Sequence, residues 1–115
     1  MRIAFLGDIA LVGCYVKENN DYSYYLDYLK SILSKYDYVV ANLESPLTNR
    51  TKSLTCKSMH LRSNIENGTI LKELGIDAVS LANNHVYDFG RKGVEETISE
   101  LNKLNISWYG VDGKT

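Results

Sequence analysis

The sequence contains one proline, two cysteines and no long hydrophobic run, and each of these scarcities argues against a class of protein. Cys14 and Cys56 are not spaced as Cys-x-x-Cys and have no histidine at zinc-finger spacing, so they are interpreted as free thiols rather than zinc ligands. No apolar run approaches the roughly 18 to 20 residues that cross a bilayer, and the first residues do not form a signal peptide. The sequence as written therefore predicts a cytoplasmic protein.

Neither sign of charge dominates the chain. Thirteen Lys and Arg residues against 14 Asp and Glu residues give a net charge of −1, and no stretch gathers the basic residues on one face. A nucleic acid is therefore not expected as a partner. A chain of 115 residues that is 44% hydrophobic and 23% charged has the size and composition of one ordinary globular domain, so residues 1–115 are expected to form a single domain.

Short apolar runs alternate with amphipathic stretches along the chain. Runs of apolar or β-favouring residues predict strands at residues 3–6, 38–43, 78–82 and 106–109. Apolar residues at spacings of three and four predict helices at residues 20–36, 65–74 and 90–104. Joined by right-handed crossovers, this order of elements predicts an α/β fold with one parallel sheet flanked by helices.

The ends of these elements give more detailed expectations. The continuous apolar run at residues 3–6 is typical of a central strand covered on both faces. Asn20 or Asp21 is expected to cap the first helix and Ser63 or Asn64 the second, which Gly75 should end in the left-handed conformation. The polar stretch between Pro46 and Arg62 predicts a long surface loop, in which His60 is interpreted as a structural residue.

Polar side chains follow three of the predicted strands at the point where each strand ends. Asp8 follows the first strand, Asn42 and Glu44 end the second, and the Asn-Asn-His triplet at residues 83–85 follows the third. Ligands of open parallel sheets bind outside the carboxyl ends of the strands, so these side chains are expected to share a site. Oxygen-rich groups with one imidazole suit a hard or borderline divalent cation such as Mn, Mg or Fe.

Each of these residues also has a structural interpretation. Asp8 follows a glycine and could be a turn residue, Asn42 could be a hydrogen-bonded core amide, and Glu44 could be a solvated loop carboxylate. The triplet at residues 83–85 favours a functional role, because three polar side chains directly after a buried strand are costly if they lack partners. Asp88 is expected to cap the helix that follows it.

Three segments together resemble the successive motifs of a known family. The segments are FLGDI at residues 5–9, ANLESPL at 41–47, and LGIDAVSLANNH at 74–85 with DFG at 88–90. They resemble the CapA, or poly-gamma-glutamate capsule biosynthesis, family, which is similar to the calcineurin-like metallophosphoesterases in fold and motif order. The resemblance runs along essentially the whole chain. It implies the first half of a metallophosphoesterase-like αββα sandwich, in a domain that is incomplete at its C-terminus.

The resemblance also implies a role for each matching residue. Asp8, Glu44 and Asn84 would be ligands of a divalent metal, Mn or Fe/Zn, with Asn42 as a supporting ligand. His85 would be the acid that protonates the leaving-group oxygen during two-metal hydrolysis of a phosphoester. The substrate class implied is a phosphoester or a surface-polymer precursor.

Two departures from the family pattern keep a second hypothesis open. Metallophosphoesterases usually carry a histidine two residues after the first aspartate, where this chain has Ala10, and no histidine follows His85 to match the later metal-binding motifs. A catalytically inactive accessory or assembly protein of surface-polymer synthesis is therefore the alternative. A general small-molecule domain is less favoured, because no glycine-rich phosphate loop follows the first strand. A sheet face without its second layer would associate with another copy or with the missing C-terminal half.

Overall fold

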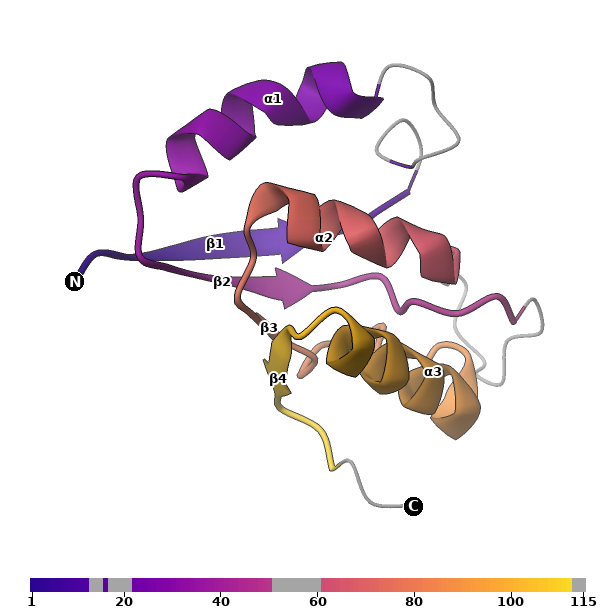
Figure 1. Cartoon of the computed structure of the whole chain (residues 1–115). Coiled ribbons are helices and arrows are strands. Elements are labelled where there is room, and N and C mark those ends of the chain that lie inside the picture. The colour runs from indigo at the N-terminus through magenta and orange to yellow at the C-terminus, as the bar shows by residue number, and fades with distance from the viewer. Residues whose placement is uncertain (13–15, 17–21, 51–60, 113–115) are drawn as a thin grey trace.

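The computed structural model describes residues 1–12, 16, 22–50 and 61–112 as four strands and the helices between them (Figure 1). The strands are β1 (Ile3–Ile9), β2 (Tyr38–Leu43), β3 (Ala78–Ser80) and β4 (Ser107–Tyr109). The helices are α1 (Tyr22–Leu33), the short 3₁₀ helix η1 (Ile65–Asn67), α2 (Gly68–Leu74) and α3 (Gly90–Lys103). The expectations for Cys14, Cys56, His60 and the cap at Asn20 or Asp21 lie outside the described residues.

All strand pairs are parallel and the sheet order is β1-β2-β3-β4, which confirms the α/β prediction of a parallel sheet flanked by helices. The order also places β1 at an edge of the sheet, so the expectation of a central first strand is wrong. Ile3 is 44% exposed and Phe5 is 77% exposed in this strand. Ala4 and Leu6 pack against the core, whereas Ile3 and Phe5, which alternate with them, lie on the open side of the strand.

The core lies on one face of the sheet. In β2, the side chains of Val39, Ala41 and Leu43 are buried, whereas the residues that alternate with them are not. Parallel pairing places Ala41 beside Val79, and Val79 beside Trp108, so the same face continues across the sheet. These residues form one hydrophobic cluster with helical side chains that include Leu33, Ile70, Leu71, Val94 and Leu101. The helices therefore cover the face that carries Ala41 and Val79.

β1 and β2 lose their regular register near the end of β1. Phe5 pairs with Val40, and the next recorded pair joins Asp8 to Asn42, so β1 advances by three residues while β2 advances by two. Pairing then continues from Ile9 to Leu43. This is the two-against-one count of a β-bulge, which bends a strand and changes the side to which its next residues point.

The predicted helix at residues 65–74 is divided into η1 and α2. Gly68 lies at the junction, where an added Cβ would come within 3.1 Å of side-chain atoms of Leu47 and Leu104. Asn64 holds the N-cap position of η1 without a side-chain cap hydrogen bond, so its predicted capping bond is absent. Gly75 ends α2 with a φ of 82°, which confirms the predicted left-handed stop. No helix among the described residues has the length and apolar character needed to cross a membrane.

The burial of two leucines predicts a large difference in the stability lost when each is replaced by alanine. Leu71 is fully buried in the core, whereas Leu29 of α1 is 37% exposed. Leu71→Ala is expected to lower the free energy of unfolding by about 2–5 kcal/mol, because it leaves a cavity as well as removing apolar contacts. Leu29→Ala makes the same chemical change with an expected loss of about 1 kcal/mol or less. Urea denaturation measures both values, and equal losses would contradict the placement of the core.

Candidate functional site

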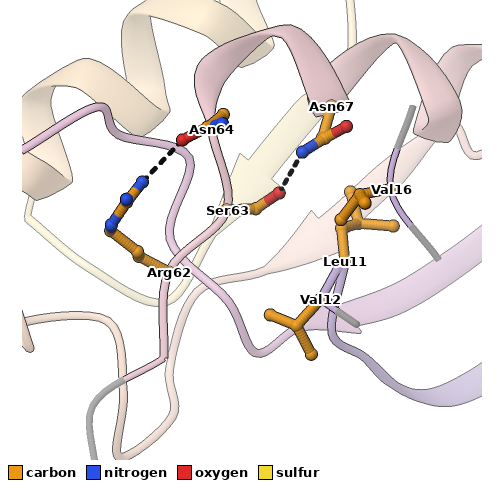
Figure 2. Close-up of a pocket in the computed structure, with 7 residues that line it drawn as sticks. All are labelled: Leu11, Val12, Val16, Arg62, Ser63, Asn64 and Asn67. Carbon is orange, nitrogen blue, oxygen red and sulfur yellow. Dashed lines mark hydrogen bonds between the residues drawn. The ribbon is translucent and has the colours of Figure 1, made fainter. Parts of the chain in front are cut away.

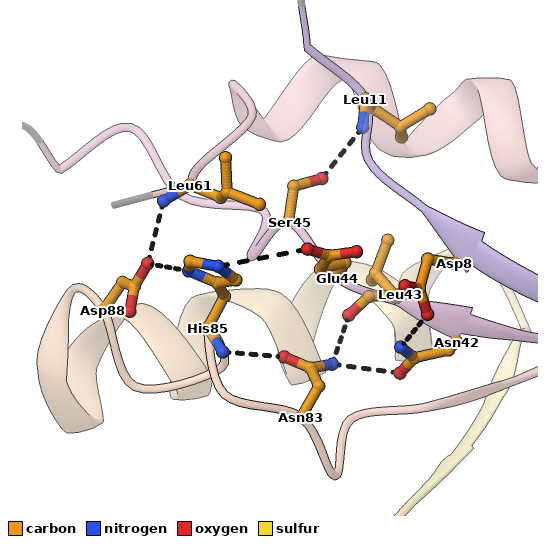
Figure 3. Close-up of polar contacts among 10 residues, drawn as sticks. All are labelled: Asp8, Leu11, Asn42, Leu43, Glu44, Ser45, Leu61, Asn83, His85 and Asp88. Carbon is orange, nitrogen blue, oxygen red and sulfur yellow. Dashed lines mark hydrogen bonds and ion pairs between the residues drawn. The ribbon is translucent and has the colours of Figure 1, made fainter. Parts of the chain in front are cut away.

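The polar residues that follow the strands meet at the carboxyl edge of the sheet (Figure 3). Asp8 of β1 pairs with Asn42 of β2 in the register, and the Asn42 side-chain amide donates to Asp8 Oδ1 at 2.6 Å. Asn83 donates in turn to Asn42 Oδ1 at 3.1 Å and to the carbonyl oxygen of Leu43 at 2.8 Å. A row of hydrogen bonds therefore joins the ends of β1 and β2 to the segment after β3.

Sequence reasoning included Asn83 in the triplet at residues 83–85 but gave it no role of its own. Its Oδ1 accepts the backbone N–H of His85 at 3.0 Å, which is a turn that asparagine favours, while its Nδ2 holds the end of β2. Asn84, the predicted ligand, has an exposed side chain instead. The turn tendency of asparagine was the available signal, but it does not distinguish two adjacent asparagines.

His85 lies between two carboxylates from different parts of the chain. Its Nδ1 is 2.5 Å from Asp88 Oδ2, and its Nε2 is 3.9 Å from Glu44 Oε1. The imidazole is 9% exposed, the Asp88 side chain is fully buried, and the Glu44 side chain is 25% exposed. The histidine therefore has a buried partner on one side and a partly solvated carboxylate on the other.

Asp88 does not act as the predicted helix cap. The N-cap position of α3 belongs to Phe89, and no side-chain cap hydrogen bond forms there. The Asp88 carboxylate instead contacts His85 and accepts the backbone N–H of Leu61 at 2.8 Å. A fully buried carboxylate is costly unless it is paired and hydrogen-bonded, and these contacts meet that requirement.

The contact with Asp88 determines how the imidazole is oriented. When Asp88 is ionised it has no proton to donate, so in that state Nδ1 carries the proton of this hydrogen bond. Nε2 is then the ring nitrogen that faces Glu44, at the less buried side of the network. An imidazole held in this way can accept or release a proton at Nε2 without rotating.

The backbone around Glu44 is fixed by its own hydrogen bonds. The Glu44 N–H donates to the carbonyl oxygen of Ile9 at 2.8 Å, which extends the pairing of β1 and β2 beyond the last residue of β2. Ser45 is fully buried, and its hydroxyl oxygen accepts the N–H of Leu11 at 2.9 Å. The segments that follow β1 and β2 are therefore tied together directly beside Glu44.

The described residues supply only part of a metal coordination shell. The oxygens of Asp8 and Glu44 are of the type that hard divalent cations prefer. However, no group of three or more His, Cys, Asp or Glu side chains gathers closely enough to hold a metal ion in the described ranges 1–12, 16, 22–50 and 61–112. Asn42 Oδ1 already accepts a hydrogen bond from Asn83. A metal ion at this edge would therefore need further ligands from outside the described residues.

The sheet and its polar edge define the class of this protein: an α/β domain whose parallel strands bring carboxylates, amides and an imidazole to one edge. Its family follows from comparison with known proteins. Residues 2–115 match the family described as bacterial capsule synthesis protein PGA_cap, and the chain belongs to that family. This finding confirms the family that the sequence motifs resemble.

Two relatives from the genus Bacillus have the same level of identity. The chain is 32% identical over 114 residues to the "PGA biosynthesis protein CapA" of Bacillus subtilis (strain 168). The aligned region covers 96% of this chain and 30% of the relative. It is 32% identical over 116 residues to the "Capsule biosynthesis protein CapA" of Bacillus anthracis, with coverage of 96% and 28%. The chain therefore spans less than a third of the length of these curated relatives.

Removal of the Asp88 carboxylate tests whether it orients His85. In Asp88→Ala, the acceptor for His85 Nδ1 and for the Leu61 N–H is lost, so the His85 ring is expected to lose its fixed Nδ1–H form. The free energy of unfolding should fall by about 1–3 kcal/mol, because buried donors lose their partner. A proton–nitrogen correlation spectrum of the histidine ring reports the tautomer.

Asp27→Ala provides the matched control for this experiment. Asp27 is exposed on α1, so its removal should leave both the His85 ring spectrum and the stability nearly unchanged. An unchanged His85 spectrum in Asp88→Ala would contradict the orienting role.

Proposed function

We propose that this chain forms part of a capsule synthesis protein that hydrolyses a phosphoester in a metal-dependent reaction. The substrate would be a phosphoester carried by a precursor of the surface polymer. The single observation that supports this proposal is the meeting of Asp8, Glu44 and His85 at one edge of the sheet, from segments far apart in the sequence. Membership of the capsule synthesis family supports the biological setting.

The proposal gives each residue of the polar edge a role. Asp8, Glu44 and Asn84 would contribute ligands, with Asn42 in support, and further ligands would come from outside the described residues. A divalent cation, Mn or Fe/Zn, supplies Lewis-acid polarisation of the phosphoryl group when it is bound. The doubly protonated ring of His85 would give its Nε2 proton to the leaving-group oxygen and become the neutral Nδ1–H form, which Asp88 holds through Nδ1.

A specific observation favours a second candidate, an accessory or assembly protein without catalysis. Most polar groups of the edge bind one another: Asp8 with Asn42, Asn42 with Asn83, and His85 with Asp88. A network that satisfies its own hydrogen-bonding groups is what a structural polar cluster requires. In this case the residues would stabilise the ends of the strands, and the chain would act in polymer synthesis through binding.

Calorimetric titration with Mn²⁺ distinguishes the two candidates. The catalytic proposal expects saturable binding by the chain, and a loss of at least about tenfold in affinity in both Asp8→Ala and Asn84→Ala, because each removes an oxygen ligand. Asp27→Ala removes a carboxylate from the exposed surface of α1 and should bind as the unsubstituted chain does. Because Asn84 is exposed, its substitution should not disturb the fold.

The results would be interpreted together with circular dichroism spectra of the same samples. Binding that both site variants weaken, followed by hydrolysis of a phosphodiester by the metal-loaded chain, would support the catalytic proposal. A folded chain that does not bind Mn²⁺, or binds it equally well in all variants, would contradict the contribution of Asp8 and Asn84 and favour the accessory role.

The open face of the sheet supports a further proposal about partners. We infer that this face contacts a second copy of the chain or the remainder of a longer protein, and that no nucleic acid takes part. Phe5 is 77% exposed and Tyr109 is 52% exposed on strands at opposite edges of the sheet. Exposed apolar surface of this kind is often an interaction site. The predicted cytoplasmic location stays a prediction.

Light scattering of the 115-residue chain tests the contact with a second copy. The mass is expected to exceed that of a monomer and to fall in Phe5→Ser, because the substitution removes the one aromatic side chain of β1, which is exposed. Tyr28→Ser alters an equally exposed aromatic residue on α1 and should leave the mass unchanged. A monomer at all concentrations would contradict association between copies.

A further inference from the structure

An open hollow of about 320 Å³ lies between the segment that follows β1 and the residues that lead into η1 (Figure 2). The residues that line it come from the segment after β1, from the residues just before η1 and from the last residue of η1: Leu11, Val12, Val16, Arg62, Ser63, Asn64 and Asn67. Leu11 joins the hollow to the polar edge, because its N–H donates to the hydroxyl oxygen of Ser45, the neighbour of Glu44. A ligand in this hollow would therefore be held close to the polar edge.

The charge of the hollow comes from Arg62. Its guanidinium donates through Nη1 to Asn64 Oδ1 at 2.6 Å and to the carbonyl oxygen of Thr48 at 3.3 Å, and both of these acceptors are neutral. Within the described part of the chain, no ion pair joins Arg62 to a carboxylate. The carboxylate of Glu96 reaches only as far as the Thr48 hydroxyl, from which it accepts at 2.6 Å. Arg62 is therefore a positioned cation without a counter-charge among the described residues.

Other polar residues of the hollow form a rigid wall. The Asn67 amide donates to the Ser63 hydroxyl oxygen at 2.9 Å, and both side chains are buried. The backbone of Ser63 is bonded on both sides, since its N–H donates to the carbonyl oxygen of Pro46 and its carbonyl oxygen accepts the N–H of Thr48. These two hydrogen bonds pair Ser63 in parallel with the segment around Leu47. The pairing sets the position of Arg62, which precedes Ser63 in the sequence.

The opposite wall is apolar. Leu11 is 3% exposed and Val12 is half-buried, and both present aliphatic side chains to the hollow together with Val16. A cation and amides on one wall and branched aliphatic groups on the other suit a ligand that has both characters. Binding sites commonly combine apolar walls with a few polar groups that fix the orientation of the ligand.

We propose that this hollow binds an oxyanion carried on a short aliphatic arm. The oxyanion, a carboxylate or a phosphate, bonds to the guanidinium of Arg62, whose planar set of N–H donors matches either group. The aliphatic arm packs against Leu11 and Val12. The identification of this ligand with a distal anionic group of the substrate rests on the proposed function, whereas the binding itself does not.

Titrations followed by NMR test the proposal with two probes, glutarate and butyl phosphate. The 115-residue chain is titrated in the presence of EDTA, so that no divalent metal contributes. Saturable shifts are expected at the backbone amides of Val12, Arg62, Ser63 and Asn64. Tighter binding of glutarate identifies a carboxylate ligand and tighter binding of butyl phosphate identifies a phosphate ligand. Shifts that do not saturate, or that spread over the whole chain, would overturn the proposal.

Three variants separate a specific site from general attraction of anions. Arg62→Gln is expected to weaken binding by about tenfold or more, the usual effect of losing a hydrogen bond to a charged group. Arg91→Gln removes the same charge from an exposed position on α3 and should leave the affinity unchanged. Val12→Trp fills the hollow while it retains Arg62, and should also weaken binding. Equal affinities in the Arg62 and Arg91 variants would contradict the assignment.

Asp8→Ala keeps this test independent of the metal proposal. Asp8 lies at the polar edge and does not line the hollow, so this variant should bind the preferred probe as the unsubstituted chain does. Retained probe binding together with absent Mn²⁺ binding would support the anion site and count against the metal-dependent function. Failure of probe binding in a chain that binds Mn²⁺ would overturn the anion site and support the metal-dependent function.

Discussion

Burial of one face of a four-stranded parallel sheet is the constraint on which the rest of this structure depends. Ala41 and Val79 lie side by side in the register and face the helices, and Leu71 and Leu101 cover that face from α2 and α3. The helices can serve as crossover connections only if all the strands run in the same direction. As a result, the carboxyl ends of the strands meet at one edge, where the polar residues lie.

The polar edge combines two different electrostatic situations. Asp8 and Asn42 are near solvent, and their hydrogen bond lies at the end of the β1–β2 pairing. Asp88 is fully buried and connects His85 to the backbone of Leu61, which comes from a distant part of the chain. The buried pair fixes the position of the imidazole, whereas Asp8 and Asn42 lie nearer to solvent. A site that combines a fixed imidazole with groups open to solvent is suited to binding as well as to chemistry.

Much of this arrangement could be predicted from the sequence, because local patterns determine it. The apolar runs predicted the four strands, and Gly75 ends α2 in the left-handed conformation that glycine favours. Asp8, Asn42, Glu44 and His85 lie at the ends of the strands, while their roles as a site stay a prediction. The partners within that edge depend on tertiary packing: Asp88 is a buried partner of His85, and the backbone of Leu61, distant in the sequence, donates to the same carboxylate. The edge position of β1 could not be predicted from the sequence either, because a short apolar run does not reveal how many sides of the strand are covered.

The bulge in β1 also determines from which direction a ligand can approach the site. Without the extra residue, the partner of Asn42 would be Gly7, and Asp8 would point toward the helices, as Leu43 does. The extra residue reverses the side to which the following side chains of β1 point. Asp8 therefore shares with Asn42 the face that the helices leave uncovered, while Ile9 points toward the core. The bulge therefore makes the Asp8 carboxylate accessible from the open face of the sheet, instead of burying it in the core, where an unpaired charge is costly.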